Sequence, residues 1–188
     1  MKERPILFST LMVQALLAGN KTQTRRSIKS INNLTNEHFC FTLREVNPEF
    51  GYAVFDGLLP TGEICPYGKL GDILWVRETW AKGRLVDEDE KEVYNGWLYR
   101  ANADFEDDPE LSPGFKWHPS IHMRKEACRI KLQITNIRVE RVQDISSLDA
   151  IAEGCKYTHE YPELWESING IDSWSSNPWV WCITFKKL

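Results

Sequence analysis

The sequence contains no long run of apolar residues. Its longest, Trp179–Phe185, is interrupted by Thr184 and is far too short to span a bilayer. Residues 1–18 lack the charged start, the apolar centre and the small-residue cleavage site of a secretory signal. From these absences we expect a cytoplasmic protein rather than a membrane-bound or secreted one.

Metal-binding motifs are also missing. The five cysteines are widely spaced and form no CxxC pair, which excludes a zinc ribbon and a thioredoxin-type motif and favours free thiols. His118 and His122 lie four residues apart, as two metal ligands on one helical face would. Pro119 disturbs a helix between them, and no acidic or thiol residue lies at ligand spacing. We therefore expect neither a metal ion nor another cofactor.

The length and composition of the chain indicate one globular domain. The chain has 188 residues, of which 42% are hydrophobic, 12% aromatic and 27% charged. This length and composition are typical of a single domain with its own core, and no internal repeat or low-complexity segment interrupts it. Eight tryptophans are many for this length, and large aromatic side chains occupy mainly cores and ligand surfaces.

Charge is segregated along the chain although the net charge is only -4. Residues 1–30 contain six basic residues and one acidic residue, and residues 124–141 contain six and two. Residues 85–112 contain ten acidic and two basic residues, and they form either one side of a polar molecule or a pair of solvated loops. The pattern predicts a basic face suited to a phosphate-bearing ligand, while the acidic total argues against a non-specific binder of duplex DNA.

The hydrophobic pattern predicts a mixed α and β protein. Helices are expected over 11–18, where Gly19 follows, and over 146–153 and 161–169. Residues 30–50 are polar and aperiodic and predict a long loop. A strand over 128–142 should bend near Asn136. Further strands are expected over 6–9, 21–28, 52–59, 73–80, 97–101 and 179–185, which together favour a small curved or closed sheet.

The segment Gly19–Arg26 is the densest group of chemically useful side chains. If it is extended, alternation puts Lys21, Gln23 and Arg25 on one face and Thr22, Thr24 and Arg26 on the other, unless a twist brings Lys21 and Thr24 together. A lysine near other cations can act as a base, a threonine can act as a nucleophile, and an arginine can hold phosphate. The alternative is a solvated edge strand whose cations prevent aggregation.

Three further positions are candidates. Glu78 lies in an apolar strand, so it needs either a partner, such as Arg26 or a residue near Arg77, or a function. Trp80 and Tyr99 can stack on a nucleobase or belong to the core. The loop 116–123 is expected to line the basic cleft.

Glu153 ends a predicted helix just before Gly154. An acid at a helix C-terminus opposes the macrodipole, which favours a role elsewhere. A frayed and exposed glutamate is the alternative.

Several of these motifs occur together in one known family. Gly19-x-Lys21-x-x-Thr24-x-Arg26 after an Ala/Leu-rich helix resembles the signature of ASCH-domain proteins, which belong to the PUA-like superfold. The likeness, strongest to the long phage- and prophage-associated branch, continues through Gly68-x-x-Gly71-Asp72, Leu74–Trp80, Tyr99-Arg100-Ala101, Pro119–Met123, Asp149-Ala150-x-x-Glu153-Gly154 and Asn177–Trp181.

The resemblance implies one domain over residues 1–188 with insertions near 30–50, 85–96 and 102–116. Its fold would be α+β: a PUA-like β-barrel of five or six mostly antiparallel strands with short flanking helices and loop insertions. Such a protein would bind RNA, a nucleotide or a modified nucleoside in a basic, aromatic-lined cleft. With no apolar run long enough to span a bilayer, we expect no membrane partner, and the sequence leaves the oligomeric state open.

Two functions follow from the resemblance. In the binding hypothesis, Lys21, Arg25 and Arg26 hold phosphate and Trp80, Tyr99 or Trp117 stacks on an unpaired base. The cleft is completed by Glu78, Ser120 and His122. In the hydrolase reading, Lys21, Thr24 and Glu153 match the catalytic set of a small ASCH amidohydrolase that deacetylates acetylated cytidine; another branch is reported as ribonuclease. A phage protein that blocks a host partner with its acidic loops is a third possibility.

Overall fold

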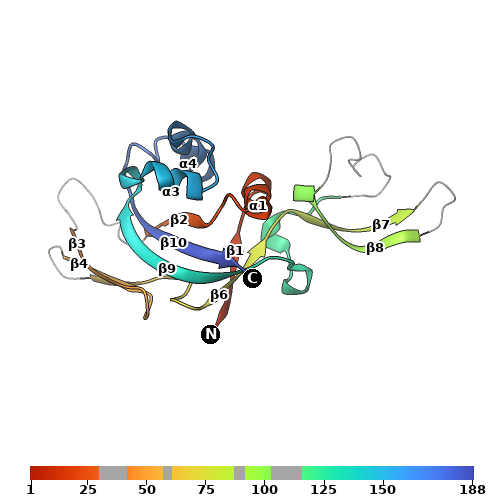
Figure 1. Cartoon of the computed structure of the whole chain (residues 1–188), viewed down its shortest axis with the longest axis horizontal. Coiled ribbons are helices and arrows are strands. Elements are labelled where there is room, and N and C mark those ends of the chain that lie inside the picture. Colours follow the sequence, from red (N-terminus) through yellow and green to blue (C-terminus); the bar gives the residue numbers. More distant parts are fainter. Residues whose placement is uncertain (30–41, 57–60, 87–91, 103–115) are drawn as a thin grey trace.

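The computed structural model describes residues 1–29, 42–56, 61–86, 92–102 and 116–188 (Figure 1). Most of its strand pairs are antiparallel and its helices are short, which confirms the predicted α+β class. Within these residues, no helix combines the length and the apolar character needed to cross a membrane.

The largest sheet has five strands. Their order is β1 (Glu3–Leu7), β6 (Ile73–Arg77), β9 (Lys131–Arg141), β10 (Trp179–Lys187) and β2 (Gln23–Ser27). β1 runs parallel to β6, and the other neighbouring pairs are antiparallel. β1 and β2 are therefore the first two strands of the chain but lie at opposite edges of the sheet.

β9 is the long strand that the sequence predicts over 128–142, and it curves along its length in Figure 1. Its register with β10 shifts between Thr184 and Phe185, which pair with Asn136 and Ile134. The irregularity lies where the sequence predicts a bend.

Two smaller antiparallel sheets lie at opposite ends of the view in Figure 1. One contains β3 (Thr42–Asn47), β4 (Tyr52–Asp56) and β5 (Thr61–Ile64), and the other contains β7 (Trp80–Val86) and β8 (Glu92–Tyr99).

The loops predicted over 30–50 and 85–96 are wrong where β3, β7 and β8 run through them. β3 has only two apolar residues, Leu43 and Val46, and the acidic run between β7 and β8 in the sequence favoured a loop there. The remainder of these segments, with residues 103–115, lies largely outside the described residues.

Three α-helices lie on the same side of the five-stranded sheet (Figure 1). α1 (Thr10–Leu17) begins after Ser9, whose hydroxyl accepts a hydrogen bond from the Met12 amide at 3.4 Å. α3 (Ser147–Ala152) begins after Ser146 in the same way, and α4 is Tyr161–Asn169. Short 3-10 turns span Arg100–Asn102, Ser120–His122, Lys125–Ala127, Val142–Asp144 and Thr158–Glu160.

Two apolar cores hold the helices against the sheet. In the first, Val13 and Leu16 of α1 are buried with Ile183 of β10. In the second, Tyr161 and Trp165 of α4 are buried with Ala150 of α3 and Val180 of β10. Because both cores contain β10, they bring the C-terminal end of α3 next to the segment that leads into β2.

Candidate functional site

A buried ion pair joins Lys21 and Glu153, which are 132 positions apart in the sequence. The Lys21 ammonium donates one hydrogen bond to Oε2 of Glu153 at 2.8 Å and another to the Glu153 carbonyl at 2.7 Å. Only 2% of Lys21 and 3% of Glu153 is exposed. An unpaired charge is very costly to bury, so each group depends on the other. The alternative of a frayed, exposed Glu153 is therefore wrong.

Gly154 positions Glu153 against the chain that follows α1. Its φ of +98° lies in the left-handed region, and a Cβ there would lie 2.9 Å from the Cβ of Ala15 in α1. The backbone of Thr22 also donates a hydrogen bond to the carbonyl of Ala152 at 2.8 Å. A glycine after α3 thus permits a close approach that no other residue allows without strain.

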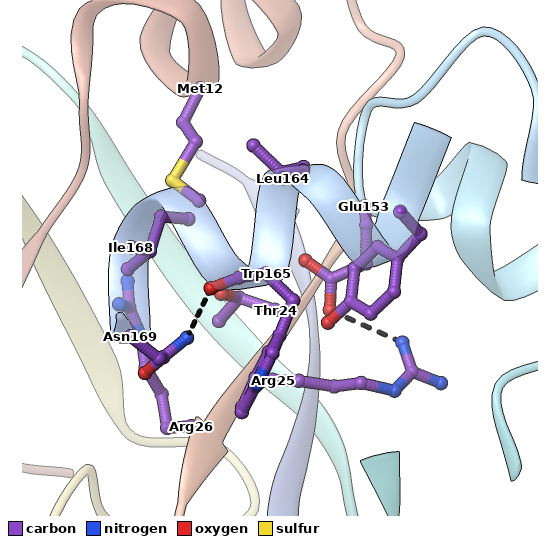
Figure 2. A pocket seen from close by; sticks show the side chains of 10 residues that line it. Met12, Thr24, Arg25, Arg26, Glu153, Leu164, Trp165, Ile168 and Asn169 are labelled. Carbon is purple, nitrogen blue, oxygen red and sulfur yellow. Dashed lines mark hydrogen bonds and ion pairs between the residues drawn. The ribbon is translucent and has the colours of Figure 1, made fainter. Parts of the chain in front are cut away.

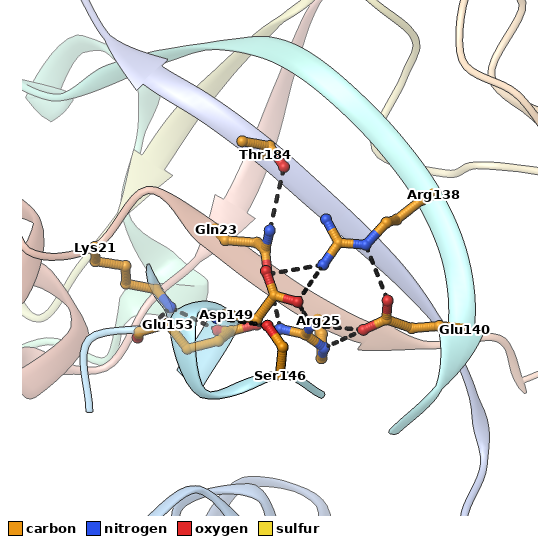
Figure 3. Close-up of polar contacts among 9 residues, drawn as sticks. All are labelled: Lys21, Gln23, Arg25, Arg138, Glu140, Ser146, Asp149, Glu153 and Thr184. Carbon is orange, nitrogen blue, oxygen red and sulfur yellow. Dashed lines mark hydrogen bonds and ion pairs between the residues drawn. The ribbon is translucent and has the colours of Figure 1, made fainter. Parts of the chain in front are cut away.

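Arg25 extends the pair into a network (Figure 3). Its Nη2 lies 2.5 Å from Oε1 of Glu140 and 3.2 Å from Oδ2 of Asp149, and its Nη1 lies 3.2 Å from Oε1 of Glu153. Nη1 also donates a hydrogen bond to Oε1 of Gln23 at 2.8 Å. Lys21, Gln23 and Arg25 all face this network, as strand alternation predicts, and the alternative of a solvated edge strand is wrong.

A second arginine completes the network. Arg138 donates to Oε2 of Glu140 at 2.9 Å through Nε and to Oδ2 of Asp149 at 2.7 Å through Nη2. The network contains three carboxylates and three cations, so its formal charges balance. Lys21 and Arg25 were both predicted to hold phosphate. Since both are buried and bound by carboxylates of the chain itself, neither is presented to a phosphate.

Thr24 lies beside the network in a small pocket beneath α4 (Figure 2). The pocket has a volume of about 10 Å³, which is room for about one water molecule. Among the described residues, no hydrogen bond joins the Thr24 hydroxyl to Lys21 or Glu153. Arg26 also lines the pocket, and its Nη2 donates a hydrogen bond to the Leu7 carbonyl at 2.7 Å.

A larger groove adjoins this pocket. It has a volume of about 370 Å³, and we call it the α1–α4 groove. Its lining residues are Leu11, Met12, Ala15, Glu153, Gly154, Cys155, Lys156, Glu160 and Leu164. Met12, Glu153 and Leu164 line both the groove and the Thr24 pocket, so these three side chains lie between the two spaces.

Burial changes the acid–base properties of this region. It lowers the pKa of the Lys21 ammonium, against the opposing effect of the Glu153 carboxylate. Burial raises the pKa of the Cys155 thiol to about 11, so this thiol stays protonated near neutral pH and is a poor nucleophile. The groove is therefore lined by Glu153, whose carboxylate is paired with the buried Lys21 behind it, and by a thiol that stays protonated.

Glu78 belongs to a different cluster. It is 1% exposed and forms two hydrogen bonds with Arg129, from Nε at 2.9 Å and from Nη2 at 2.8 Å. Its partner is thus Arg129 and not Arg26. The Arg129 guanidinium lies 4.0 Å from the centre of the Tyr99 ring, and the Tyr99 hydroxyl donates a hydrogen bond to the Ala127 carbonyl at 2.7 Å. Glu78 and Tyr99 therefore stabilise the base of β8.

The other aromatic candidates gather around the β7–β8 sheet. Trp80 stacks on His118 with ring centres 4.8 Å apart, and Arg100 lies 5.4 Å from the ring centre of Trp117. Trp80, Tyr99 and Trp117 line neither the Thr24 pocket nor the α1–α4 groove.

The predicted loop residues are also separate from the network. Ser120 and His122 form a 3-10 turn with Ile121, whose carbonyl accepts a hydrogen bond from Arg77. Over the part of the chain that the structure describes, no group of three or more His, Cys, Asp or Glu side chains is arranged to hold a metal ion.

Sequence reasoning missed part of the site. Arg138 and Glu140 alternate on β9 and so share a face, which was a usable signal. Tyr161 and Trp165 line the Thr24 pocket, and their spacing of four residues marks one face of a helix. Gln23 and Asp149 were visible in the motifs but had no assigned role.

Because of this network, the free energy of unfolding should change with pH in the acidic range. Partial burial raises the pKa of Asp149, but hydrogen bonding with Ser146 and the charge of Arg138 lower it by a larger amount, so the net shift is downward. A carboxyl group whose pKa is lowered by folding stabilises the fold above its unfolded pKa, near about 4, and loses that effect as pH falls through its folded value.

We therefore expect Asp149→Asn to destabilise the protein at pH 6, with the difference from the wild type shrinking below about pH 4. Urea unfolding midpoints at several pH values would measure this. Asp144→Asn, at an exposed position on the 3-10 turn before α3, is the control and should give no such pH-dependent gap. A gap for Asp149→Asn that stayed constant down to pH 2 would contradict the assignment.

Comparison of the chain with protein-family models, with curated proteins and with solved structures gives no significant match.

Proposed function

We propose that this chain is an ASCH-domain protein of PUA-like fold that binds RNA, a nucleotide or a modified nucleoside, with the base held in the α1–α4 groove. The α+β class and the short helices beside a mostly antiparallel sheet are compatible with that family. Further support comes from the motif residues that carry the resemblance. Lys21 and Glu153 are in contact, and Thr24 lines a pocket with Glu153.

The observation that carries the proposal is a groove of about 370 Å³ with mostly apolar walls, to which the buried Glu153 contributes the carboxylate. Ligand sites are typically concave and apolar with a few fixed polar groups, and this volume lies within their usual range. A nucleobase has flat apolar faces and polar edges. A carboxylate can accept a hydrogen bond from the exocyclic amino group of cytosine. Glu153, oriented by Lys21 and Arg25, is placed to read such an edge.

In the α1–α4 groove a nucleobase would contact other side chains than the aromatic ones that the sequence suggested. Aliphatic residues of α1 and α4 line the groove, whereas the predicted aromatic residues lie near β7 and β8. Lys156 is exposed at the groove and can meet a phosphate, and Arg26 beside Thr24 can do so if the Thr24 pocket opens.

Binding can be tested by titrating the protein with cytidine, acetylated cytidine, cytidine monophosphate and a short single-stranded RNA. Glu153→Gln should weaken the ligand that binds best by about 10-fold or more, because a hydrogen bond to a charged group is worth about 1.5–3 kcal/mol. Glu163→Gln, at an exposed position on α4, is the matched control. Equal affinities for both variants, or no binding of any of these ligands, would contradict the proposal.

A second candidate is hydrolysis of an amide on a modified base. The 2.8 Å contact between Lys21 and Glu153, beside Thr24, favours it. In such a reaction the Thr24 oxygen bonds to the amide carbonyl carbon, and its proton passes to the Lys21–Glu153 pair. That proton then goes to the amine as the C–N bond breaks, and water hydrolyses the resulting ester. Met12 and Leu164 must move first, because the Thr24 pocket has room for only about one water molecule.

Release of acetate from acetylated cytidine would test this second candidate. Thr24→Val keeps the side-chain shape and removes the hydroxyl, so it should abolish release while leaving binding in the groove. A Thr24→Val variant that releases acetate at the wild-type rate would exclude Thr24 as the nucleophile.

A further inference from the structure

A second pocket lies near the start of β1, at the opposite edge of the five-stranded sheet from β2. It has a volume of about 370 Å³ and shares no lining residue with the α1–α4 groove. Its walls come from the start of the chain, from the turn between β3 and β4, and from the segment 64–72 that follows β5. We call it the β1 pocket.

The β1 pocket is rich in unpaired positive charge. Lys2, Arg4 and Lys69 line it, and among the described residues none of the three forms an ion pair with a carboxylate. Its one acidic residue is Asp72, which is 3% exposed and accepts hydrogen bonds from the backbone amides of Lys2 at 2.8 Å and Lys69 at 3.4 Å. This carboxylate therefore holds the pocket walls together and leaves the three cationic side chains free.

Arg4 is only partly exposed, and its guanidinium group lies in the wall of the pocket. Its Nε is buried and has no hydrogen-bond partner within the described part of the chain. A buried donor without an acceptor is unfavourable, and nearly all such groups in folded proteins are paired. An anion in the pocket would lie beside this guanidinium group, and phosphate suits the fork of donors that such a group carries.

Phe50 adds an aromatic surface beside these charges. Its side chain is 66% exposed, and the Lys69 ammonium lies 5.8 Å from the centre of its ring. A large aromatic residue so exposed next to unpaired cations is typical of sites where a base stacks while its phosphate is held. Neighbouring Ile64, 78% exposed, adds apolar surface.

The turns that carry these side chains are held together closely. Gly51 has a φ of +71°, and a Cβ at this position would lie 2.5 Å from the Gly68 carbonyl oxygen. The Cys65 amide also donates a hydrogen bond to the Gly51 carbonyl at 2.7 Å. Phe50 and Lys69, each next to one of these glycines, are thus held near each other before any ligand arrives, which reduces the entropic cost of binding.

We infer that the β1 pocket binds a phosphate ester with a flat aromatic group, namely a nucleotide, either free or within a single strand. Arg4, Lys2 and Lys69 receive the phosphate, and Phe50 stacks on the base. The inference goes beyond the proposed function because it requires neither Glu153 nor the α1–α4 groove.

The test titrates the full chain with adenosine monophosphate, inorganic phosphate and a single-stranded RNA octamer. The double variant Lys2→Ala/Lys69→Ala should lose about 10-fold or more in affinity for all three, since each phosphate contact is charge-assisted. Phe50→Ala should weaken the two ligands that carry bases and leave inorganic phosphate unchanged. Lys186→Ala/Lys187→Ala removes two exposed lysines at the end of β10 and is the matched control.

The affinities of these variants, measured together with Glu153→Gln, distinguish binding in the β1 pocket from binding in the α1–α4 groove. If Phe50→Ala and Lys2→Ala/Lys69→Ala lower the affinity while Glu153→Gln leaves it unchanged, the β1 pocket is supported and the groove is not the site that these ligands occupy. Loss in Glu153→Gln alone overturns the β1 pocket and leaves the groove. If Lys186→Ala/Lys187→Ala lowers the affinity as much as Lys2→Ala/Lys69→Ala does, the binding is non-specific charge attraction, and the inference is also overturned. If the RNA octamer binds more tightly than adenosine monophosphate, the phosphate comes from a nucleic-acid strand. If the two affinities are equal, the ligand is the free nucleotide.

Discussion

Lys21→Met should lower the free energy of unfolding by about 3 kcal/mol, as urea denaturation would measure. The substitution keeps the length of the side chain and removes the ammonium that holds Glu153. The carboxylate then remains buried with only one contact, 3.2 Å from Nη1 of Arg25. Breaking one side of a buried ion pair typically costs about 3–5 kcal/mol because it leaves an uncompensated charge. We expect the lower end because Arg25 remains.

The double variant Lys21→Met/Glu153→Leu should regain most of that loss. Replacing both members of a buried pair with apolar residues removes the stranded charge, and such replacements are often neutral. Lys156→Met, at an exposed position beside the same groove, is the control and should stay within about 0.5 kcal/mol of the wild type. If Lys21→Met also changed stability by less than that amount, Lys21 and Glu153 would not be paired in solution.

Gly154→Ala should destabilise the protein by about 3 kcal/mol and weaken ligand binding in the groove. The φ of +98° strains any residue with a Cβ, and the new Cβ would lie 2.9 Å from that of Ala15. Neither atom is at the end of a flexible side chain, so α1 and the turn after α3 must separate. Glu153 precedes this glycine and would move away from Lys21.

Gly19→Ala separates the two causes. Gly19 also has a positive φ, +79°, but a Cβ there would meet nothing within 4 Å. It should therefore cost only the backbone strain, about 1 kcal/mol, and leave binding unchanged. Calorimetric melting of both variants, with a nucleoside titration of each, would measure the difference. Equal losses of stability would mean that the contact with α1 does not matter.

The parts of this structure that could be predicted depend on local geometry. Period-two alternation correctly places Gln23 and Arg25 of β2 on the same side as Lys21, which precedes the strand, and a serine before each of α1 and α3 marks where these helices begin. The polar strand β3 gave no such signal, because its pairing uses backbone groups that every residue carries, and only the end of β8 was predicted, as part of a strand over 97–101.

The partners of these residues could not be predicted in the same way. Arg25 meets Glu140 only because β9, β10 and β2 are neighbours in that order, and this order depends on how the whole sheet assembles. The same holds for Glu78, whose partner Arg129 lies 51 positions away. The aromatic residues near β7 were candidates for the cleft by composition alone, and composition carries no information on which wall a side chain joins.

The placement of β2 has a consequence for how the chain is made. Its pairing partner is β10, so that Thr24 lies opposite Ile183, and within the described residues β2 pairs with no earlier strand. On the ribosome, residues 21–27 emerge early and then wait until synthesis has passed Lys187. Through that interval Lys21 and Arg25 have not yet met Glu153 and Glu140, and β2 has no strand partner, so its unpaired edge is open to wrong partners.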